Sequence, residues 1–181
     1  MKTISPEYAA LNQQLHATCD HYGCKSKRHE QIVWRLMVKH GCNSLLDYGC
    51  GKGSLVKCFE NRHPAIQTQG FDPGHPEYLD PPRPADMVVC TDVLEHIEPE
   101  LVQSVLKDIQ ANARKAGFFV IALRPDSSKL LPDGTNPHKI VQDVGDWLMD
   151  FNEAWGKTWT AKIYDYTQDK QVAMFIEWKN S

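Results

Sequence analysis

A short glycine-rich segment between a predicted strand and a predicted helix constrains the fold of this chain more than any other feature. Residues 44–48 form an apolar, strand-like run, the residues GCGKG follow at 49–53, and a helical pattern continues to about Glu60. Glycines let a backbone turn tightly and let a ligand approach without a Cβ in the way. In open α/β sheets, ligands bind beyond the carboxyl ends of the central strands. The segment therefore predicts an α/β fold with a ligand site at this turn.

Strand and helix patterns alternate along the rest of the chain. Strands are predicted at residues 67–71, 86–90 and 118–123, and helices at 29–39, 99–115 and 140–155, after an N-terminal helix that starts at Ser5-Pro6. Two further strands, 159–166 and 171–178, form a predicted closing hairpin. Because strands that alternate with helices make a parallel sheet, we expect a Rossmann-like three-layer α/β sandwich. Its sheet is mostly parallel and ends in a C-terminal antiparallel hairpin.

Two acidic residues accompany the glycine-rich turn. Asp47 stands two residues before it, and Asp72 ends the second strand, where such folds hold ribose hydroxyls. The dinucleotide fingerprint is Gly-x-Gly-x-x-Gly, whereas this chain has Gly-x-Gly-x-Gly. The pattern resembles motif I of the class I S-adenosylmethionine-dependent methyltransferases. Residues 86–97, DMVVCTDVLEHI, look like the fourth-strand motif of the same superfamily and are particularly similar to its ubiquinone-biosynthesis O-methyltransferase branch.

This resemblance implies an enzyme that uses S-adenosylmethionine. The glycine-rich turn would form the floor under the cofactor's methionine half, Asp72 would hold the ribose, and Tyr22 would be a lid residue. Thr91 and Asp92 would border the transferable methyl group. The implied cofactor-binding residues are Tyr22, Asp47, Gly49, Cys50, Gly51, Gly53, Asp72, Pro73, Thr91 and Asp92.

The chain departs from the family pattern between residues 72 and 86. This stretch is short and rich in proline, so the usual third strand–helix unit is expected to be missing and the adenine contact to come from the short loop. We expect a single methyltransferase domain over residues 1–181. Its N-terminal helices, in 1–42, would cover the cofactor site, and residues 43–181 would form the Rossmann-like core.

A second cluster suggests either a metal site or a base. If the chain turns helical after the third strand, Asp92, Glu95 and His96 project from one side of a single turn. His138, in the loop after the next strand, could join them. The set resembles the Glu-x-x-Glu-His plus distant His site of the small-RNA 3′-terminal 2′-O-methyltransferases, which implies Mg²⁺, Mn²⁺ or Zn²⁺. Without a metal, His96 or His138 is the expected general base, because imidazole accepts a proton near neutral pH.

A further group of possible zinc ligands lies near the N-terminus, at His16, Cys19, His21 and Cys24. Structural zinc sites usually join two ligand pairs across a longer loop. Four donors within nine residues favour instead a loop or helix end with incidental cysteine and histidine.

The composition indicates which class of methyl acceptor to expect. The formal net charge is −3, and proteins that clamp a phosphate backbone usually carry a basic excess, so nucleic acid is not the expected partner. We expect methylation of a small molecule, most readily at oxygen. The alternatives are an RNA 2′-O-methyltransferase and a non-catalytic S-adenosylmethionine-binding sensor or scaffold. Without a bilayer-spanning apolar run or a signal-peptide pattern, no membrane contact is expected and the cytoplasm is the expected location.

Overall fold

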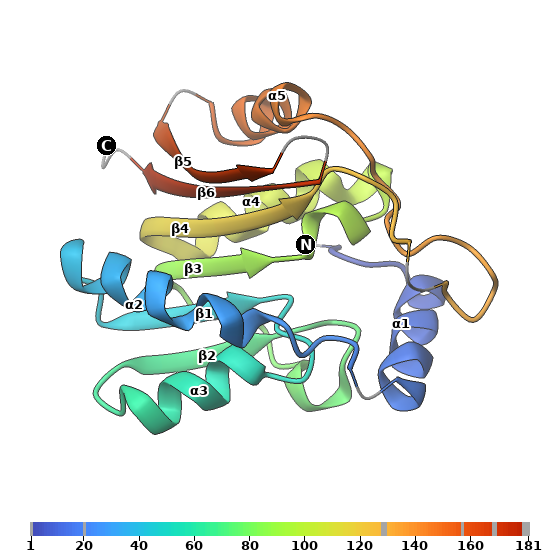
Figure 1. Ribbon diagram of the computed structural model, residues 1–181, viewed down its shortest axis with the longest axis horizontal. Coiled ribbons are helices and arrows are strands. Elements are labelled where there is room, and N and C mark those ends of the chain that lie inside the picture. Colours follow the sequence, from blue (N-terminus) through green and yellow to red (C-terminus); the bar gives the residue numbers. More distant parts are fainter. Residues whose placement is uncertain (1, 20, 128–129, 157, 168–169, 179–181) are drawn as a thin grey trace.

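A computed structural model describes residues 2–19, 21–127, 130–156, 158–167 and 170–178 of the 181-residue chain. In this part of the chain, six strands form one sheet with the order β2-β1-β3-β4-β6-β5 (Figure 1). The first four strands are parallel to one another, and β6 and β5 complete the sheet in antiparallel pairing. The strands are β1 (Ser44–Tyr48), β2 (Gln67–Phe71), β3 (Ala85–Thr91), β4 (Ala113–Ala122), β5 (Trp159–Thr167) and β6 (Gln171–Trp178).

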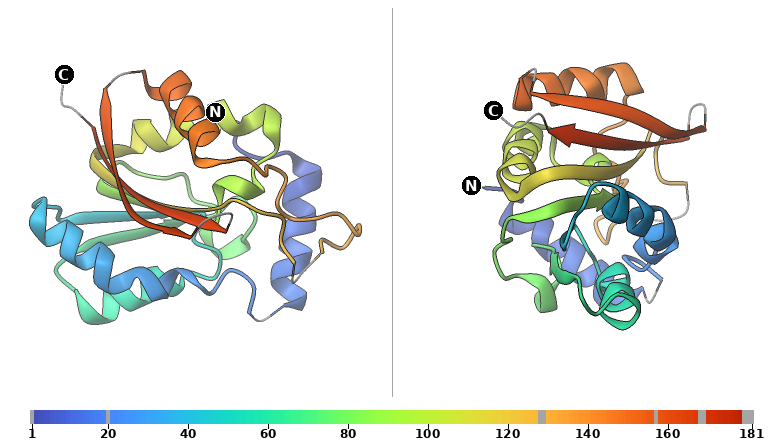
Figure 2. Two further views of the ribbon diagram at one scale, coloured as in Figure 1. Left: turned by 45° about the horizontal axis from the view of Figure 1, so that its top comes forward. Right: turned by 90° about the vertical axis from the view of Figure 1, so that its left-hand side faces the viewer.

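Helices cover both faces of the sheet. The helices α4 (Val102–Asn112) and α5 (Val144–Trp155) pack on one face, and α2 (Glu30–Lys39) and α3 (Ser54–Arg62) pack on the other (Figure 2). Side chains alternate between the two faces along each strand. In β1, for example, Leu46 belongs to the α4–α5 core and Leu45 to the α2–α3 core. The predicted three-layer Rossmann-like sandwich with a C-terminal antiparallel hairpin is confirmed.

The connection from β2 to β3 is short, as the sequence predicts. In residues 72–84 the chain forms one 3-10 turn, η2 (Pro76–Tyr78), and no strand or α-helix. The backbone N–H of Asp72 donates to the Tyr78 carbonyl at 2.8 Å, which closes this loop on itself. The sheet therefore lacks the third strand–helix unit, and β2 is its edge.

Helix boundaries differ from the prediction at two places. The helix predicted over 99–115 begins with a 3-10 turn, η4 (Pro99–Leu101), and α4 ends at Asn112 because the next residue, Ala113, already pairs with β3. Residues 114 and 115 are polar, so the hydrophobic pattern does not show where the helix ends and the strand begins. The last helix begins at Val144 instead of 140, because the Asp143 side chain caps it by accepting the Asp146 N–H at 3.0 Å.

The first helix, α1 (Pro6–Thr18), stands apart from the layers. It begins at its predicted cap, Ser5, whose hydroxyl accepts the Tyr8 N–H at 3.1 Å. Figure 1 shows α1 beyond the right-hand ends of the strands, where β3 points. Tyr8 and Leu15 pack against Leu131 in a small cluster separate from the two main cores. None of the helices described reaches the combination of length and apolar character that a membrane span requires.

Candidate functional site

A cavity of about 480 Å³ lies at the carboxyl ends of the parallel strands, next to α1. Its size is typical of small-ligand sites. It receives residues from α1, from the turn after β1, from the loop after β2, from the end of β3 and from the segment after β4. The predicted residues on its wall are Tyr22, Gly49, Cys50, Gly51, Asp72, Pro73, Thr91, Asp92, Glu95, His96 and His138. Asp47 and Gly53 are not on the wall.

Gly51 of the glycine-rich turn packs closely against Gly23, which lies in an earlier segment of the chain. Gly51 has φ +53° and Gly23 has φ +69°, a conformation that favours glycine. A Cβ on Gly51 would lie 2.6 Å from both the Cα and the carbonyl oxygen of Gly23. Lys52 N–H donates to that same carbonyl at 3.0 Å. Backbone packing against Gly23, in addition to access for a ligand, therefore requires glycine at position 51.

Asp72 connects this turn to the loop after β2. Its Oδ2 accepts the Gly51 N–H and its Oδ1 the Gly74 N–H, both at 2.8 Å. Burial raises the pKa of the Asp72 carboxyl, and the two amide bonds oppose that rise. A carboxylate oxygen has two acceptor positions, so each oxygen keeps one for a ligand hydroxyl. The predicted ribose contact is compatible with this geometry.

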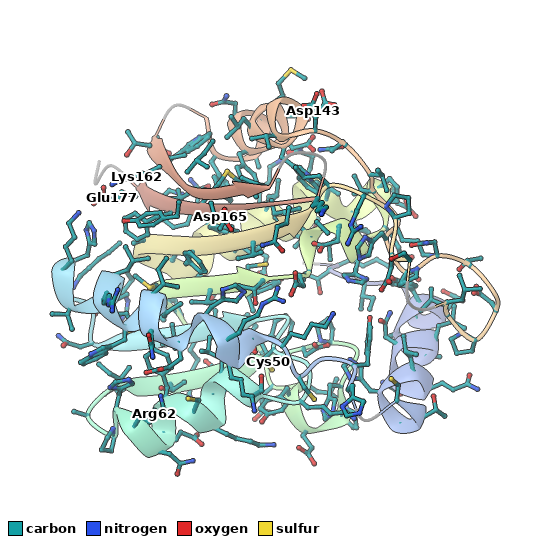
Figure 3. All side chains as sticks on the ribbon, viewed as in Figure 1. Cys50, Arg62, Asp143, Lys162, Asp165 and Glu177 are labelled. Carbon is teal, nitrogen blue, oxygen red and sulfur yellow. The ribbon has the colours of Figure 1, made fainter. Side chains whose placement is uncertain are left out.

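The two predicted residues outside the cavity wall, Asp47 and Gly53, flank the residues of the turn that reach it. Asp47 is fully buried in β1, and burial, with the nearby Asp72 charge, raises the pKa of its carboxyl to about 7. Gly53 precedes α3, and a Cβ there would collide with the Tyr78 hydroxyl. Figure 3 shows Cys50, which does reach the wall, at the turn between these positions.

Asp92 does not take the place predicted for it beside Glu95 and His96. The chain bends at Asp92, which has φ +56°, and only then enters a 3-10 turn, η3 (Leu94–His96). The Asp92 carboxylate instead forms an ion pair with Arg28 at 2.9 Å. The expectation of one helical turn presenting all three side chains was therefore wrong. A left-handed backbone at a non-glycine residue is a strained feature of the kind found at functional sites.

Glu95, His96 and His138 do come together. Each offers one ligand atom within 4.8 Å of the others. The Glu95 side chain is fully buried, its Oε1 accepts the Ala122 N–H at 3.0 Å, and burial raises its carboxyl pKa to about 8. Burial, together with nearby His138, lowers the pKa of His96 to about 3, so that this ring is neutral at physiological pH.

Backbone carbonyls fix the orientation of both imidazoles. Nδ1 of His96 lies 3.0 Å from the Pro137 carbonyl oxygen, and Nδ1 of His138 lies 2.5 Å from that of Arg124. A carbonyl only accepts, so Nδ1 carries the proton in both neutral rings and each Nε2 keeps its lone pair. This arrangement can accept a proton from a bound ligand.

The same group fits a divalent cation poorly. Mg²⁺ needs octahedral oxygen ligands, and Mn²⁺ sites are built mainly from oxygen. Here two imidazoles meet one carboxyl that keeps its proton at neutral pH, and Asp92 is engaged elsewhere. Zn²⁺ accepts nitrogen ligands, but its carboxylate ligand would have to ionise first. In the described part of the chain this is the one metal-like group, so His16, Cys19, His21 and Cys24 do not converge as zinc ligands.

Helix α1 contributes side chains to the site that no sequence motif indicates. The Tyr8 hydroxyl donates to the Pro137 carbonyl at 3.2 Å, the same oxygen that orients His96. The Tyr22 hydroxyl donates to Asn12 Oδ1 at 3.3 Å. All these side chains line the cavity except that of Pro137. No motif marks Tyr8 or Asn12 as functional, because their role depends on where α1 docks.

Comparison with known proteins identifies the architecture. A methyltransferase domain family model matches residues 20–165. No curated protein matches the sequence. Among solved structures, the plantazolicin methyltransferase BpumL, in complex with a triazolic desmethylPZN analog and SAH, has a TM-score of 0.65, 10% identity and 96% coverage of both chains.

Two further structures are similar. The 1,6-didemethyltoxoflavin-N1-methyltransferase of Burkholderia thailandensis, with 1,6-didemethyltoxoflavin and S-adenosylhomocysteine bound, has a TM-score of 0.65 and 15% identity, over 99% of this chain and 93% of that one. The DhpI–SAH complex has a TM-score of 0.60 and 14% identity, over 96% and 99%. Because the sequence identities are low, these similarities establish the fold alone and not the substrate.

Proposed function

This chain belongs to the methyltransferase domain family, and we propose that it transfers a methyl group from S-adenosylmethionine to a hydroxyl group of a small organic acceptor. The pair of imidazoles carries the proposal, because each is held through Nδ1 by a backbone carbonyl and so keeps its Nε2 lone pair whenever the ring is neutral. It lies in the cavity that also receives the glycine-rich turn and Asp72.

The residues present fit the proposed cofactor. Gly51 and Gly23 leave the floor of the cavity free of side chains, and Asp72 keeps two acceptor positions for ribose hydroxyls. Pro73 and Gly74 extend the wall beyond Asp72, where the adenine would lie against the short loop. When bound, S-adenosylmethionine supplies an electrophilic methyl group on a sulfonium centre. The carboxyl end of β3, with Thr91 and Asp92, would face that methyl group.

His138 is the proposed general base. As the acceptor oxygen takes the methyl group and S-adenosylhomocysteine is left, Nε2 of His138 would accept the hydroxyl proton. Both rings are half-buried, but the pKa of His96 is lowered to about 3, which makes His96 a much weaker base than an ordinary imidazole. The carbonyl of Arg124 would hold the resulting imidazolium through its Nδ1–H.

The presence of a base favours oxygen over nitrogen as the methylated atom. A neutral amine is already nucleophilic, whereas a hydroxyl group reacts well only as its proton leaves. The comparison structures include an N1-methyltransferase, so the fold is compatible with either atom. Membership of the ubiquinone-biosynthesis branch stays a prediction from residues 86–97. The covering role of residues 1–42 is likewise proposed, supported by Tyr8 and Asn12 on the cavity wall.

The acceptor is proposed to be small because the site next to α1 has a volume of about 480 Å³, which is typical of small-ligand sites. The plantazolicin and didemethyltoxoflavin enzymes, solved with an acceptor analogue and an acceptor bound, support this class. The test is a matched panel of hydroxyl and amino acceptors incubated with S-adenosylmethionine, with S-adenosylhomocysteine release as the readout. We expect turnover of hydroxyl acceptors that is lost in His138→Gln. Binding of the cofactor without turnover of any acceptor would instead favour the sensor alternative.

A further inference from the structure

Two basic side chains stand at the rim of the cavity on the side away from the glycine-rich turn. Arg124 follows β4 and Lys170 precedes β6, and the Leu123 N–H donates to the Lys170 carbonyl at 2.8 Å. The two residues are therefore fixed on adjoining backbone segments. Both line the cavity and both are exposed.

Neither cation has an acidic partner among the described residues. By contrast, Arg28 on the same cavity wall is paired with Asp92 at 2.9 Å. Among the carboxyl groups on the cavity wall, Asp126 lies two residues after Arg124 but forms no ion pair with Arg124 or Lys170. Glu95 keeps its proton at neutral pH, and Glu98 accepts the Ser5 N–H at 2.8 Å. Two cations that have no ion-pair partner among the described residues therefore stand at this rim, on a protein with a net charge of −3.

The sheet order separates these cations from the proposed cofactor site. Asp72 and the glycine-rich turn follow β2 and β1, and Asp92 follows β3. Arg124 follows β4 and Lys170 precedes β6, and these are the next strands in the order β2-β1-β3-β4-β6-β5. A ligand that runs along this edge thus meets the cofactor residues first, the methyl position next and the two cations last. His138 lies on the cation side, because its Nδ1 is bound to the carbonyl of Arg124.

We propose that the methyl acceptor carries an anionic group, a carboxylate or a phosphate, which Arg124 and Lys170 bind while its hydroxyl faces His138. This inference rests on the proposed function and specifies its substrate class. The planar guanidinium group matches the two oxygens of such an anion, and an ammonium group adds charge without fixed geometry. An anion anchored here also fixes the distance from the cations to the reacting oxygen, which makes Arg124 and Lys170 specificity-determining residues.

The first experiment measures binding without turnover. The full-length protein, saturated with S-adenosylhomocysteine, is titrated by calorimetry with benzoate, phenyl phosphate and uncharged benzamide. We expect at least one anion to bind about tenfold more tightly than benzamide, since roughly 1.4 kcal/mol corresponds to a tenfold change in affinity. The preference should disappear in the Arg124→Gln/Lys170→Gln double variant. Comparing benzoate with phenyl phosphate distinguishes the two anions.

Lys162→Gln is the matched control for the loss of one positive charge. Lys162 is exposed on β5, does not line the cavity, and is labelled in Figure 3 on the side of the molecule opposite α1. This variant should bind the anions like the wild type. S-adenosylhomocysteine binding is measured on every sample by thermal shift. If it is absent, the proposed function fails; if it is present and the anions do not bind, only the present inference fails.

The second experiment uses turnover. Hydroxybenzoates and their methyl esters are compared as acceptors, and the acids should have the higher kcat/KM. Arg124→Gln should raise KM for the acid about tenfold with little change in kcat, because the anion is bound equally before and during reaction. Added salt should raise KM for the acid and leave that for the ester unchanged, since exposed charges are screened.

Three results would overturn the inference. The first is equal binding of benzoate, phenyl phosphate and benzamide. The second is an anion preference that survives in the double variant. The third is a short RNA oligonucleotide that binds through Arg124 and Lys170 and is methylated while the small anions neither compete nor react, which would assign the rim to a nucleic-acid acceptor.

Discussion

The imidazole rings of His96 and His138 lie edge to face with their centroids 4.7 Å apart, and each is held through Nδ1 by a different backbone carbonyl. The rings share a tautomer and differ in their surroundings. Both rings are half-buried and line the cavity, but loss of solvation lowers the pKa of His96 to about 3. This difference assigns the proposed proton transfer to His138.

We therefore expect His138→Gln to lower kcat by about 10²- to 10⁴-fold, the usual contribution of a general base. The acid side of the pH–rate profile should vanish with it, because the titrating base is gone. His96→Gln should lower kcat less and keep the acid side of the profile. His40→Gln, which removes a histidine paired with Glu177 away from the cavity, is the control. A larger loss in His96→Gln than in His138→Gln would reverse the assignment.

Gly51→Ala should abolish cofactor binding and destabilise the fold. Its matched control is Gly41→Ala, because Gly41 has φ +60° and nothing within 4 Å of its Cβ position. Both variants lose about 1–2 kcal/mol from the left-handed backbone. Gly51→Ala should lose about 1–3 kcal/mol more, from the collision with Gly23. Urea unfolding and thermal shift with S-adenosylhomocysteine measure the two effects, and equal losses would contradict the packing between Gly23 and Gly51.

Asp72→Ala should weaken cofactor affinity at least about tenfold, since hydrogen bonds to a charged group contribute on the order of 1.5–3 kcal/mol. Asp86→Ala is the control, because Asp86 also accepts a backbone amide, that of Asn43 at 2.8 Å, but lies outside the cavity. Calorimetric titration with S-adenosylhomocysteine measures the affinity of both. Similar losses of affinity in Asp72→Ala and Asp86→Ala would mean that Asp72 acts only by stabilising its loop.

Glu95 should make stability depend on pH. Its carboxyl pKa rises from 4.5 to about 8 in the folded protein, so the native state binds this proton more tightly than the unfolded chain. Its contribution is complete below the unfolded pKa and is lost as pH rises through about 8.

Glu95→Gln isolates this contribution, because glutamine resembles the protonated acid and can still accept the Ala122 N–H. The free energy of unfolding of the wild type, relative to Glu95→Gln, should fall by up to about 1.4 kcal/mol per pH unit between those two pKa values. Denaturant titrations at a series of pH values give the slope. Parallel curves for the two proteins would show that Glu95 ionises normally.

Chelation should leave activity unchanged if His138 is the base. The reason is that the Glu95 carboxyl keeps its proton and Asp92 is paired with Arg28, which leaves two imidazoles as ready ligands. Added Zn²⁺ should inhibit, since it would compete for their Nε2 atoms. The measurement is turnover after EDTA and after return of Mg²⁺, Mn²⁺ or Zn²⁺. Activity lost in EDTA and restored by one ion would establish the metal site instead.

The sequence predicted the sheet well because its strands are short apolar runs bounded by clear turns. β1, β2 and β6 begin and end at the predicted residues, and the missing unit between β2 and β3 follows from chain length alone. Helix ends were less predictable where a side chain decides them, as Asp143 does for α5.

The site residues that belong to local sequence motifs were predicted, whereas those that depend on how distant segments pack together were not. Gly49, Gly51 and Asp72 follow from strand ends, and they do meet at the cavity. The assumption of a regular helical turn after β3 failed at Asp92, because a left-handed residue redirects its side chain to Arg28. Tyr8 could not be found at all, since nothing in α1 specifies which loop it contacts.

The Pro137 carbonyl oxygen accepts bonds from both Tyr8 on α1 and His96 in the site. Any outward swing of α1 must break the first of these bonds and so disturb the anchor of the second. The position of α1 is thereby coupled to the orientation of His96, while the proposed base, His138, keeps its own anchor on the Arg124 carbonyl.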